Sequence, residues 1–522
     1  MKKILTLICF IGFFQLGNTQ TFNKDVAPII FDNCTTCHRP GEIGPMSLTN
    51  YDDVRSWGGT IKFVTGIKYM PPWKPDPSFS TFLGETFLTD DEIQTIANWV
   101  DNAMPEGDPA DLPDLPVFPE GSQVGTPDLV LSFSEAFEHI GGNEDEYRNF
   151  VLPTGLTEDQ EIAAIEVRPG NSKLVHHALI SYDVSGEARI LDAQDEKYGY
   201  DGFGGFGVAD AFDVMFPGYV PGQKARLYPQ GLGRILPANA DLLIQMHYAP
   251  VPFADTDSSS VNIFFKKDPV EREVRSQIML PLPWIIGEPY TIAPETVKTF
   301  HGQFTVPAKV SMLAVTPHMH LLGMSWEVFA VSPAGDTTNL ISIPEWDFNW
   351  QGTFNFDRFK VLERNSVIHA FATYDNTSEN PLNPNNPPRT MTWGERTTDE
   401  MYFLPLDYVL YQEGDEDIVF NDATTSTDNP NFNLQENKLF PLYPNPTDGE
   451  IKAGFSLAKT SKVNIQVINL EGKTIKEIKS NALYNSGVNL VSFDTAEIPN
   501  GVYILNIQSK GFSMSEKFSV LK

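Results

Sequence analysis

The feature that most constrains the fold is a long succession of short apolar runs between residues 126 and 419. These runs are rich in β-branched and aromatic residues, and Gly, Pro and Asn turns break them at short intervals. Such a pattern is typical of antiparallel sheets, and helix signals in this region are few. We therefore expect a mainly β, multidomain chain whose centre is two antiparallel β-sandwiches, over residues 126–267 and 268–422.

Length and charge limit the class of protein. A chain of 522 residues is too long for a single core, and a hydrophobic content of 41% with 20% charged residues indicates globular material. The net charge of −31 argues against nucleic acid or an anionic membrane as a partner, because both favour clusters of Lys and Arg.

The first twenty residues, "MKKILTLICFIGFFQLGNTQ", have two lysines, an apolar run and then small and polar residues. This order predicts a secretory signal peptide over residues 1–20, and thus a protein exported through the periplasm. Of the three cysteines, Cys9 would leave with the signal. The remaining two, Cys34 and Cys37, are spaced too closely to form an ordinary disulfide framework, so we expect a disulfide-free protein in which they have another role.

Those two cysteines belong to "NCTTCHRPG", a C-x-x-C-H motif formed by Cys34, Cys37 and His38. This spacing is the attachment signature of c-type haem, in which two thioethers fix the porphyrin and the histidine ligates iron. A redox dithiol or a chance C-x-x-C is the alternative. Helical patterns on both sides favour haem, and Thr89 and Glu92 predict a capping box for the second helix. We expect a cytochrome c-like domain over residues 21–108.

The sixth ligand of the haem iron is expected to be Met70. It lies in "KYMPPW", which resembles the Met-Pro loop of cytochromes c, and a His/Met pair raises the haem potential. Met46 and Met104 are alternatives. After this domain, the Pro-rich stretch at residues 109–125 predicts a semi-rigid linker.

Histidines cluster in the central region. One of the nine is assigned to haem, and five of the others lie in three short strand-like stretches. Neighbours on a strand point to opposite faces, so the doubled histidine in "KLVHHALIS" is an unusual way to fill a core. Residues at i and i+2, as in "TPHMHLL", share a face and can share a metal such as copper or zinc. The five are His176, His177, His247, His318 and His320; we interpret His139, His301 and His369 as structural.

The order HH, "QMHY", HxH and "TTDEMYF" resembles the copper type II, ascorbate-dependent monooxygenases, the family of peptidylglycine hydroxylating monooxygenase and dopamine β-hydroxylase. The resemblance covers about 300 residues and implies two separate copper sites. An electron-transfer copper would be held by His176, His177 and His247. A second copper, where O2 reacts, would be held by His318, His320 and Met401, the residues expected to be catalytic. Met401 is identified by the resemblance alone, among thirteen methionines.

The chain departs from the peptide-amidating members of this family. Thr316 stands where they have an arginine that binds the peptide carboxylate, and Phe403 and Pro405 replace their asparagine and tyrosine. Ala178 follows the doubled histidine where the family's animal members have methionine. Peptidylglycine is therefore not the expected substrate.

The expected function is that of a copper-dependent monooxygenase with two copper ions and one covalently attached haem c. It would hydroxylate a C–H bond of a small organic substrate with O2, and an ascorbate-like compound or a redox protein would donate electrons through the haem. One alternative is a non-catalytic haem and copper electron-transfer protein. The other is a zinc hydrolase, which would explain neither the methionine nor the haem motif.

A polar linker over residues 423–438 leads to alternating strands broken by EG and NG turns, which predict a small immunoglobulin-like β-sandwich over residues 439–522. The order of "YPNP" at residues 443–446, "NGVY" at residues 500–503 and a basic end resembles the type IX secretion sorting domains of Bacteroidetes. The resemblance implies an interaction with the type IX secretion machinery. The protein would then be secreted or held at the cell surface of a Bacteroidetes-type bacterium.

Overall fold

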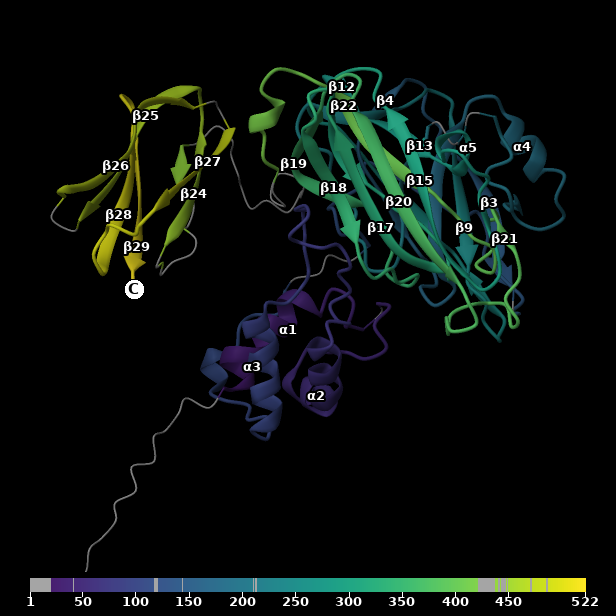
Figure 1. Ribbon diagram of the computed structural model, residues 1–522, viewed down its shortest axis with the longest axis horizontal. Helices are drawn as coiled ribbons and strands as arrows, with labels where there is room; N and C mark the ends of the chain where they lie inside the picture. Colours follow the sequence, from purple (N-terminus) through teal and green to yellow (C-terminus); the bar gives the residue numbers. More distant parts are fainter. Residues whose placement is uncertain are drawn as a thin grey trace, which may run out of the picture. The chain divides into compact units, whose positions relative to one another are not determined.

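A computed structural model describes residues 20–40, 42–116, 121–142, 144–209, 211, 214–420, 437–439, 442, 447, 449–469, 472–484 and 487–522. The predicted signal peptide and the "YPNP" motif lie outside the described residues, except for Gln20. The chain divides into two compact units, Met1–Asp428 and Asn429–Lys522. Strands dominate both units, so the protein is mainly β with several sheets (Figure 1).

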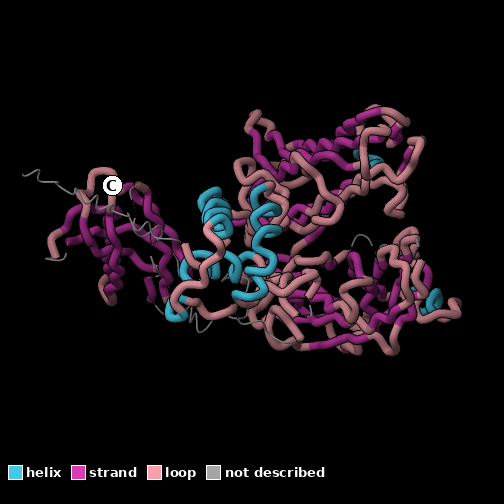
Figure 2. Tube along the Cα trace, turned by 90° about the horizontal axis from the view of Figure 1, so that it is seen from below, coloured by secondary structure: helices cyan, strands magenta, loops and turns pink. Residues whose placement is uncertain are grey.

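Helices are concentrated in the first hundred described residues of the first unit (Figure 2). The capping box predicted at Thr89 and Glu92 is confirmed at the start of α3. Helix α2 was not predicted, although Asn50 accepts a hydrogen bond from the Asp53 backbone and caps this helix. The elements are η1 (Phe22–Val26), α1 (Ala27–Asn33), α2 (Tyr51–Gly66), α3 (Asp90–Asp101) and, within the expected linker, η2 (Pro109–Asp111).

This helical module has its own apolar core. Phe22, before α1, packs on Trp99 of α3 with 6.0 Å between ring centroids, and both side chains are fully buried. One face of α3 is apolar: Ile96 is buried, and Ile93 and Val100 are half-buried against the core. The first and last helical segments of the module, η1 and α3, therefore pack against each other.

Two five-stranded sheets follow and share one apolar core. Their orders are β1-β11-β4-β8-β12 and β6-β3-β9-β5-β7. The pairing of β12 with β8 is parallel, an exception to the expected antiparallel pattern. The strands are β1 (Leu129–Ser132), β2 (Phe137–His139), β3 (Glu146–Pro153), β4 (Gln160–Arg168), β5 (Val175–Asp183), β6 (Tyr200–Asp201), β7 (Phe216–Tyr219), β8 (Leu232–Leu236), β9 (Asp241–Tyr248), β10 (Asp255–Asp257), β11 (Ser260–Phe265) and β12 (Arg272–Glu273), with helix α4 (Glu187–Asp192).

Two four-stranded sheets come next and again enclose one core. Their orders are β13-β22-β16-β19 and β15-β20-β17-β18. Alternating burial along β20 is the pattern expected of a strand with one face in the core. The elements are β13 (Arg275–Met279), β14 (Thr291–Ile292), β15 (Thr296–Thr305), β16 (Val310–Val315), β17 (Gly323–Val331), β18 (Thr337–Ile343), β19 (Phe354–Leu362), β20 (Val367–Asn376), β21 (Met391–Thr392) and β22 (Leu404–Leu410), with α5 (Pro281–Trp284) and η3 (Asp415–Asp417).

The second unit contains two further sheets, β23-β24-β27 and β26-β25-β28-β29, with a shared core. Phe455, Leu505 and Phe518 are fully buried in it. The strands are β23 (Lys438–Leu439), β24 (Glu450–Leu457), β25 (Ser461–Asn469), β26 (Thr474–Tyr484), β27 (Gly487–Asp494), β28 (Gly501–Gln508) and β29 (Ser513–Val520). Across the described residues of the whole chain, no helix is both long and apolar enough to cross a membrane.

Candidate metal centre

A β-bulge explains the doubled histidine. Where β5 pairs with β9, the register shifts between Val175 and His177, so the strand has an extra residue at His176. A bulge changes the direction of side chains, and here it brings two adjacent imidazoles together. The Nδ1 atoms of His176 and His177 lie 3.2 Å apart.

His247 completes this first group, which we call the three-histidine site (His176, His177 and His247). It lies opposite His177 on β9, and the Nδ1 atoms of these two residues are also 3.2 Å apart. Ligand nitrogens of all three lie within 4.8 Å of one another. Three imidazole nitrogens that face one point form a donor set suited to copper or zinc.

Asp145 orients His247 from behind. Its carboxylate accepts a hydrogen bond from His247 Nε2 at 2.7 Å, and the side chains of both residues are buried. With the proton on Nε2, the lone pair of Nδ1 faces the other two histidines. Burial raises the pKa of Asp145, but hydrogen bonds from His247 and Thr397 outweigh this effect and hold the pKa below its ordinary value.

Replacing Asp145 by asparagine should weaken metal binding at the three-histidine site by about 10–100-fold, the usual effect of losing a carboxylate behind a ligating histidine. Competition with a chromophoric copper chelator measures this affinity. Asp268→Asn, at an exposed carboxylate, is the matched control. An unchanged affinity in Asp145→Asn would show that the Asp145 carboxylate does not support metal binding by His247.

The HxH motif does not lie in a strand, and that expectation was wrong. Strand β16 ends at Val315, and His318 forms only an isolated bridge with Phe403. The two imidazoles nevertheless lie together after the strand, with ring centroids of His318 and His320 5.1 Å apart and planes at 89°. The Nδ1 of His318 is hydrogen-bonded to Gln351 Oε1, which leaves Nε2 for a ligand.

A buried carboxylate holds the backbone of Met401 next to that of His320. Glu400 is fully buried and accepts hydrogen bonds from the backbone N–H groups of His320 at 2.6 Å, Met401 at 2.8 Å and Leu322 at 3.0 Å. One side chain therefore fixes the backbone on both sides of the second group, which we call the His-Met site (His318, His320 and Met401).

The two sites open onto one cavity of about 1040 Å³. Its lining includes His177 from the three-histidine site together with His318, His320 and Met401. The lining residues come from both pairs of sheets. Candidate ligands of both groups therefore face the same space.

Burial lowers the pKa values of four of these imidazoles and so keeps them neutral. It lowers the pKa of His176 to about 3 and that of His318 to about 4, and neighbouring imidazoles add to the effect on His176. Burial likewise holds the pKa values of His177 and His320 well below the ordinary value. A metal requires neutral imidazole, so these histidines are ready to bind one at pH 7.

The two sites are adjacent rather than well separated. The ring centroids of His177 and His318 are 6.0 Å apart. Phe348 packs between the sites, stacked on His176 at 5.0 Å and edge-on to His320 at 5.7 Å. Nothing in the sequence indicates this proximity of the two expected copper sites.

The C-x-x-C-H segment has the donors that a c-type haem requires. Cys34 and Cys37 are not joined to each other. Burial raises the pKa of Cys34 to about 12 and also raises that of Cys37, whereas a reactive dithiol needs a lowered pKa. His38 donates through Nδ1 to the Met46 carbonyl at 3.2 Å, so its Nε2 is left for iron. These residues fit a haem better than a redox dithiol.

The three candidate methionines of the module differ in position. Met46 and Met104 pack against its core, and the sulfur of Met104 fills the space beside Gly58. Met70 is half-buried in the loop after α2, and its N–H donates to the Val64 carbonyl. Met70 stays the predicted sixth ligand of the haem.

The remaining histidines lie outside both sites. His139 is buried and its Nδ1 lies 2.7 Å from Glu146, as a structural histidine would. His301 and His369 contact each other across β15 and β20 at 2.9 Å. Sequence reasoning did not single out Asp145, Gln351, Phe348 or Glu400. Only Glu400 had a signal, because it lies within the motif "TTDEMYF".

Comparison with a family model identifies the carboxy-terminal region. Residues 441–521 match the secretion system C-terminal sorting domain. This domain directs type IX secretion, which is typical of Bacteroidetes, so the protein is secreted or located at the cell surface. The sorting domain also indicates an interaction with the type IX secretion machinery.

Other comparisons give no close relative. No curated protein matches the chain. Among solved structures, Faecalibacterium prausnitzii beta-glucuronidase is 11% identical, with 43% of this chain and 37% of that chain covered and a TM-score of 0.12. A beta-D-glucuronidase of Dictyoglomus thermophilum is 9% identical, with 48% of this chain and 43% of that chain covered and a TM-score of 0.15. The chain spans less than half the length of these two enzymes, and at such TM-scores they support no inference.

Proposed function

We propose that the chain is a secreted copper-dependent monooxygenase that hydroxylates a C–H bond of a small organic substrate with O2. The observation that carries this proposal is that the three-histidine site and the His-Met site open onto one cavity. An arrangement for metal storage or simple electron transfer has no need of so large a shared space. The proposal includes a cytochrome c-like domain with one haem and two jelly-roll-like sandwiches that each hold one copper ion.

The copper ions, when bound, would supply O2 activation and two stored electrons. The overall reaction takes one O2, one C–H bond, two electrons and two protons, and gives an alcohol and one water. Other residues of the chain keep the candidate ligands in position. Asp145 orients His247, and Gln351 orients His318. Glu400 fixes the backbone of His320 and Met401. A thioether ligand such as Met401 favours Cu(I), the state that reacts with O2.

The cavity favours a neutral, largely apolar substrate. Leu280, Tyr290 and Trp393 are among the apolar side chains that line it. Arg234 is the sole Lys or Arg side chain in the lining formed by described residues, and its guanidinium binds Asp407 at 2.9 Å. A substrate carboxylate would therefore meet no unpaired cation, in keeping with Thr316 at the position of the family's arginine.

Oxygen consumption tests the proposed function. With an excess of ascorbate and a panel of neutral apolar compounds, we expect O2 uptake coupled to a hydroxylated product that contains one atom from ¹⁸O2. Metal analysis should give two copper ions and one haem per chain. Reduction and reoxidation without any product would instead support a non-catalytic electron-transfer protein, and zinc in place of copper would support a hydrolase.

A further inference from the structure

One loop contacts both metal sites and the helical module. It connects β18 to β19 and comprises residues 344–353, which we call the bridging loop. Two of its side chains face the metal sites: Gln351 accepts the hydrogen bond from His318 Nδ1, and Phe348 packs against His176 and His320. The loop is therefore in direct contact with ligands of both sites.

The same loop contacts the segment that carries Met70. Trp350 packs edge-on against Tyr69, the neighbour of Met70, with 6.3 Å between ring centroids. Asp347 forms an ion pair with Lys74 at 3.5 Å, and both side chains are largely buried. Trp350 is bonded directly to Asn349 and Gln351 in the chain, so the aromatic contact and the His318 hydrogen bond lie on neighbouring residues.

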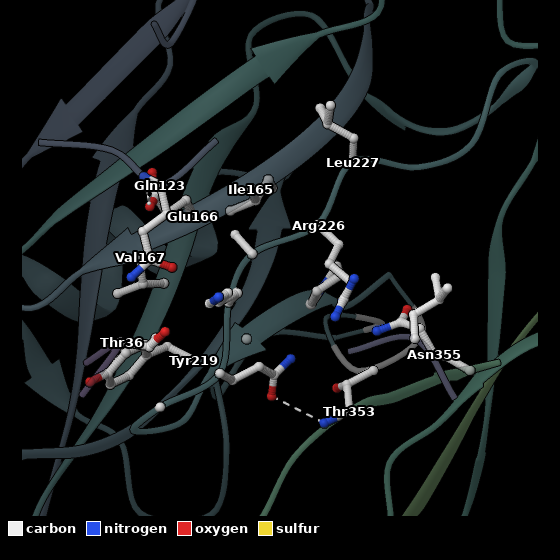
Figure 3. A pocket seen from close by; sticks show the side chains of 18 of the residues that line it. Thr36, Gln123, Ile165, Glu166, Val167, Tyr219, Arg226, Leu227, Thr353 and Asn355 are labelled. Atoms are coloured by element: carbon white, nitrogen blue, oxygen red, sulfur yellow. Dashed lines mark hydrogen bonds between the residues drawn. The ribbon is translucent and has the colours of Figure 1, made fainter. Parts of the chain in front are cut away.

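A second contact joins the bridging loop to the C-x-x-C-H segment. A cavity of about 180 Å³ lies beside Cys37 and is also lined by Gly222, Gln223 and Thr353. A methyl group placed on Gly222 would be 3.5 Å from Cys37 Sγ, so this backbone lies next to the thiol. Gln223 Oε1 accepts a hydrogen bond at 3.0 Å from the N–H of Thr353, which ends the loop (Figure 3).

The indole groups around these contacts suit a bound carboxylate. Trp73 and Trp350 each have a buried N–H with no acceptor among the residues that the structure describes. Buried donors normally have a partner. An acceptor group bound beside these indoles would complete their hydrogen bonding.

We propose that the bridging loop carries electrons from the haem to the His-Met site, with entry through Trp350, Gln351 and His318. This inference rests on the proposed function. In each transfer one electron leaves Fe(II), which becomes Fe(III), and reduces Cu(II) at the His-Met site to Cu(I), with no proton or group transferred. An aromatic contact joins Tyr69 to Trp350, and covalent and hydrogen-bonded contacts then join Trp350 to His318 through Gln351. This succession of contacts supports this order of sites. Among the described residues of the loop, only the Phe348 ring contacts His176, and this contact is not a hydrogen bond.

Replacing Trp350 by leucine tests the route. A flash-generated reductant reduces the haem of anaerobic protein that holds Cu(II), and the haem absorption then reports reoxidation by copper. We expect reoxidation to slow several-fold in Trp350→Leu. The haem spectrum, copper content and turnover with excess ascorbate should stay unchanged, because ascorbate can reduce copper directly. Phe329→Leu removes an aromatic ring on β17 that stacks on His369, away from the loop, and should behave as wild type.

Tyr69→Leu tests the same contact from the helical module and replaces Trp350→Leu if that variant does not fold. Unchanged reoxidation in both variants would overturn the route. So would a wild-type haem that copper does not reoxidise while ascorbate still drives turnover, and in that case the proposed function would stand. A wild-type protein that binds no copper would overturn both the route and the proposed function.

Discussion

Replacing Met401 by isoleucine should abolish turnover while the fold and the three-histidine site stay intact. Isoleucine has a similar volume but no sulfur, so the His-Met site would lose its thioether and its preference for Cu(I). The side chain of Met401 is half-buried at the cavity, and its backbone N–H would still bind Glu400. The substitution should therefore abolish turnover and leave the free energy of unfolding unchanged.

The measurement combines product formation with copper X-ray absorption of the reduced protein. Wild type should show a sulfur neighbour of copper, and Met401→Ile should show nitrogen and oxygen neighbours alone. Met324→Ile makes the same change at an exposed methionine of β17 and should be fully active. Retained turnover in Met401→Ile would show that this methionine is not a ligand in the reaction.

Replacing Glu400 by leucine should destabilise the first unit by about 2–6 kcal/mol, because two fully buried backbone N–H groups would lose their acceptor at about 1–3 kcal/mol each. These N–H groups belong to His320 and Leu322. The loss should appear as a lower denaturant midpoint of the first unit. Copper at the His-Met site should fall with it, since the backbone on either side of the site would no longer be fixed.

The conservative variant Glu400→Gln keeps one of the two acceptor oxygens of this side chain. Its amide oxygen can still accept hydrogen bonds from His320 and Met401, so its destabilisation should be smaller than that of Glu400→Leu. Glu413→Leu, at an exposed glutamate, is the control for the substitution itself. A denaturant midpoint for Glu400→Leu equal to that of the control would contradict the role given to this carboxylate.

Local patterns allowed part of the fold to be predicted. The capping box at Thr89 and the mainly β pattern after residue 126 follow from local sequence, and the structure confirms both. Helix α2 was not predicted because glycines and polar residues interrupt its apolar residues. Its buried apolar side chains are those of Val54 and Ile61. Tertiary packing rather than periodicity defines that helix.

Candidate ligands could be chosen from sequence, but not their arrangement. The histidine pair at His176 and His177 implied a special role, yet the bulge that lets both imidazoles meet His247 depends on the pairing with β9. A residue that orients a ligand has no sequence signature of its own. Asp145 and His247 are 102 positions apart in the chain, and only folding brings them together.

Anomalous diffraction at the copper edge tests the central claim most directly, because it locates each metal in a crystal of the full chain. We expect two copper peaks, one among the Nδ1 atoms of His176, His177 and His247 and one beside His318, His320 and Met401. A single peak, or copper bound away from these six side chains, would contradict the account.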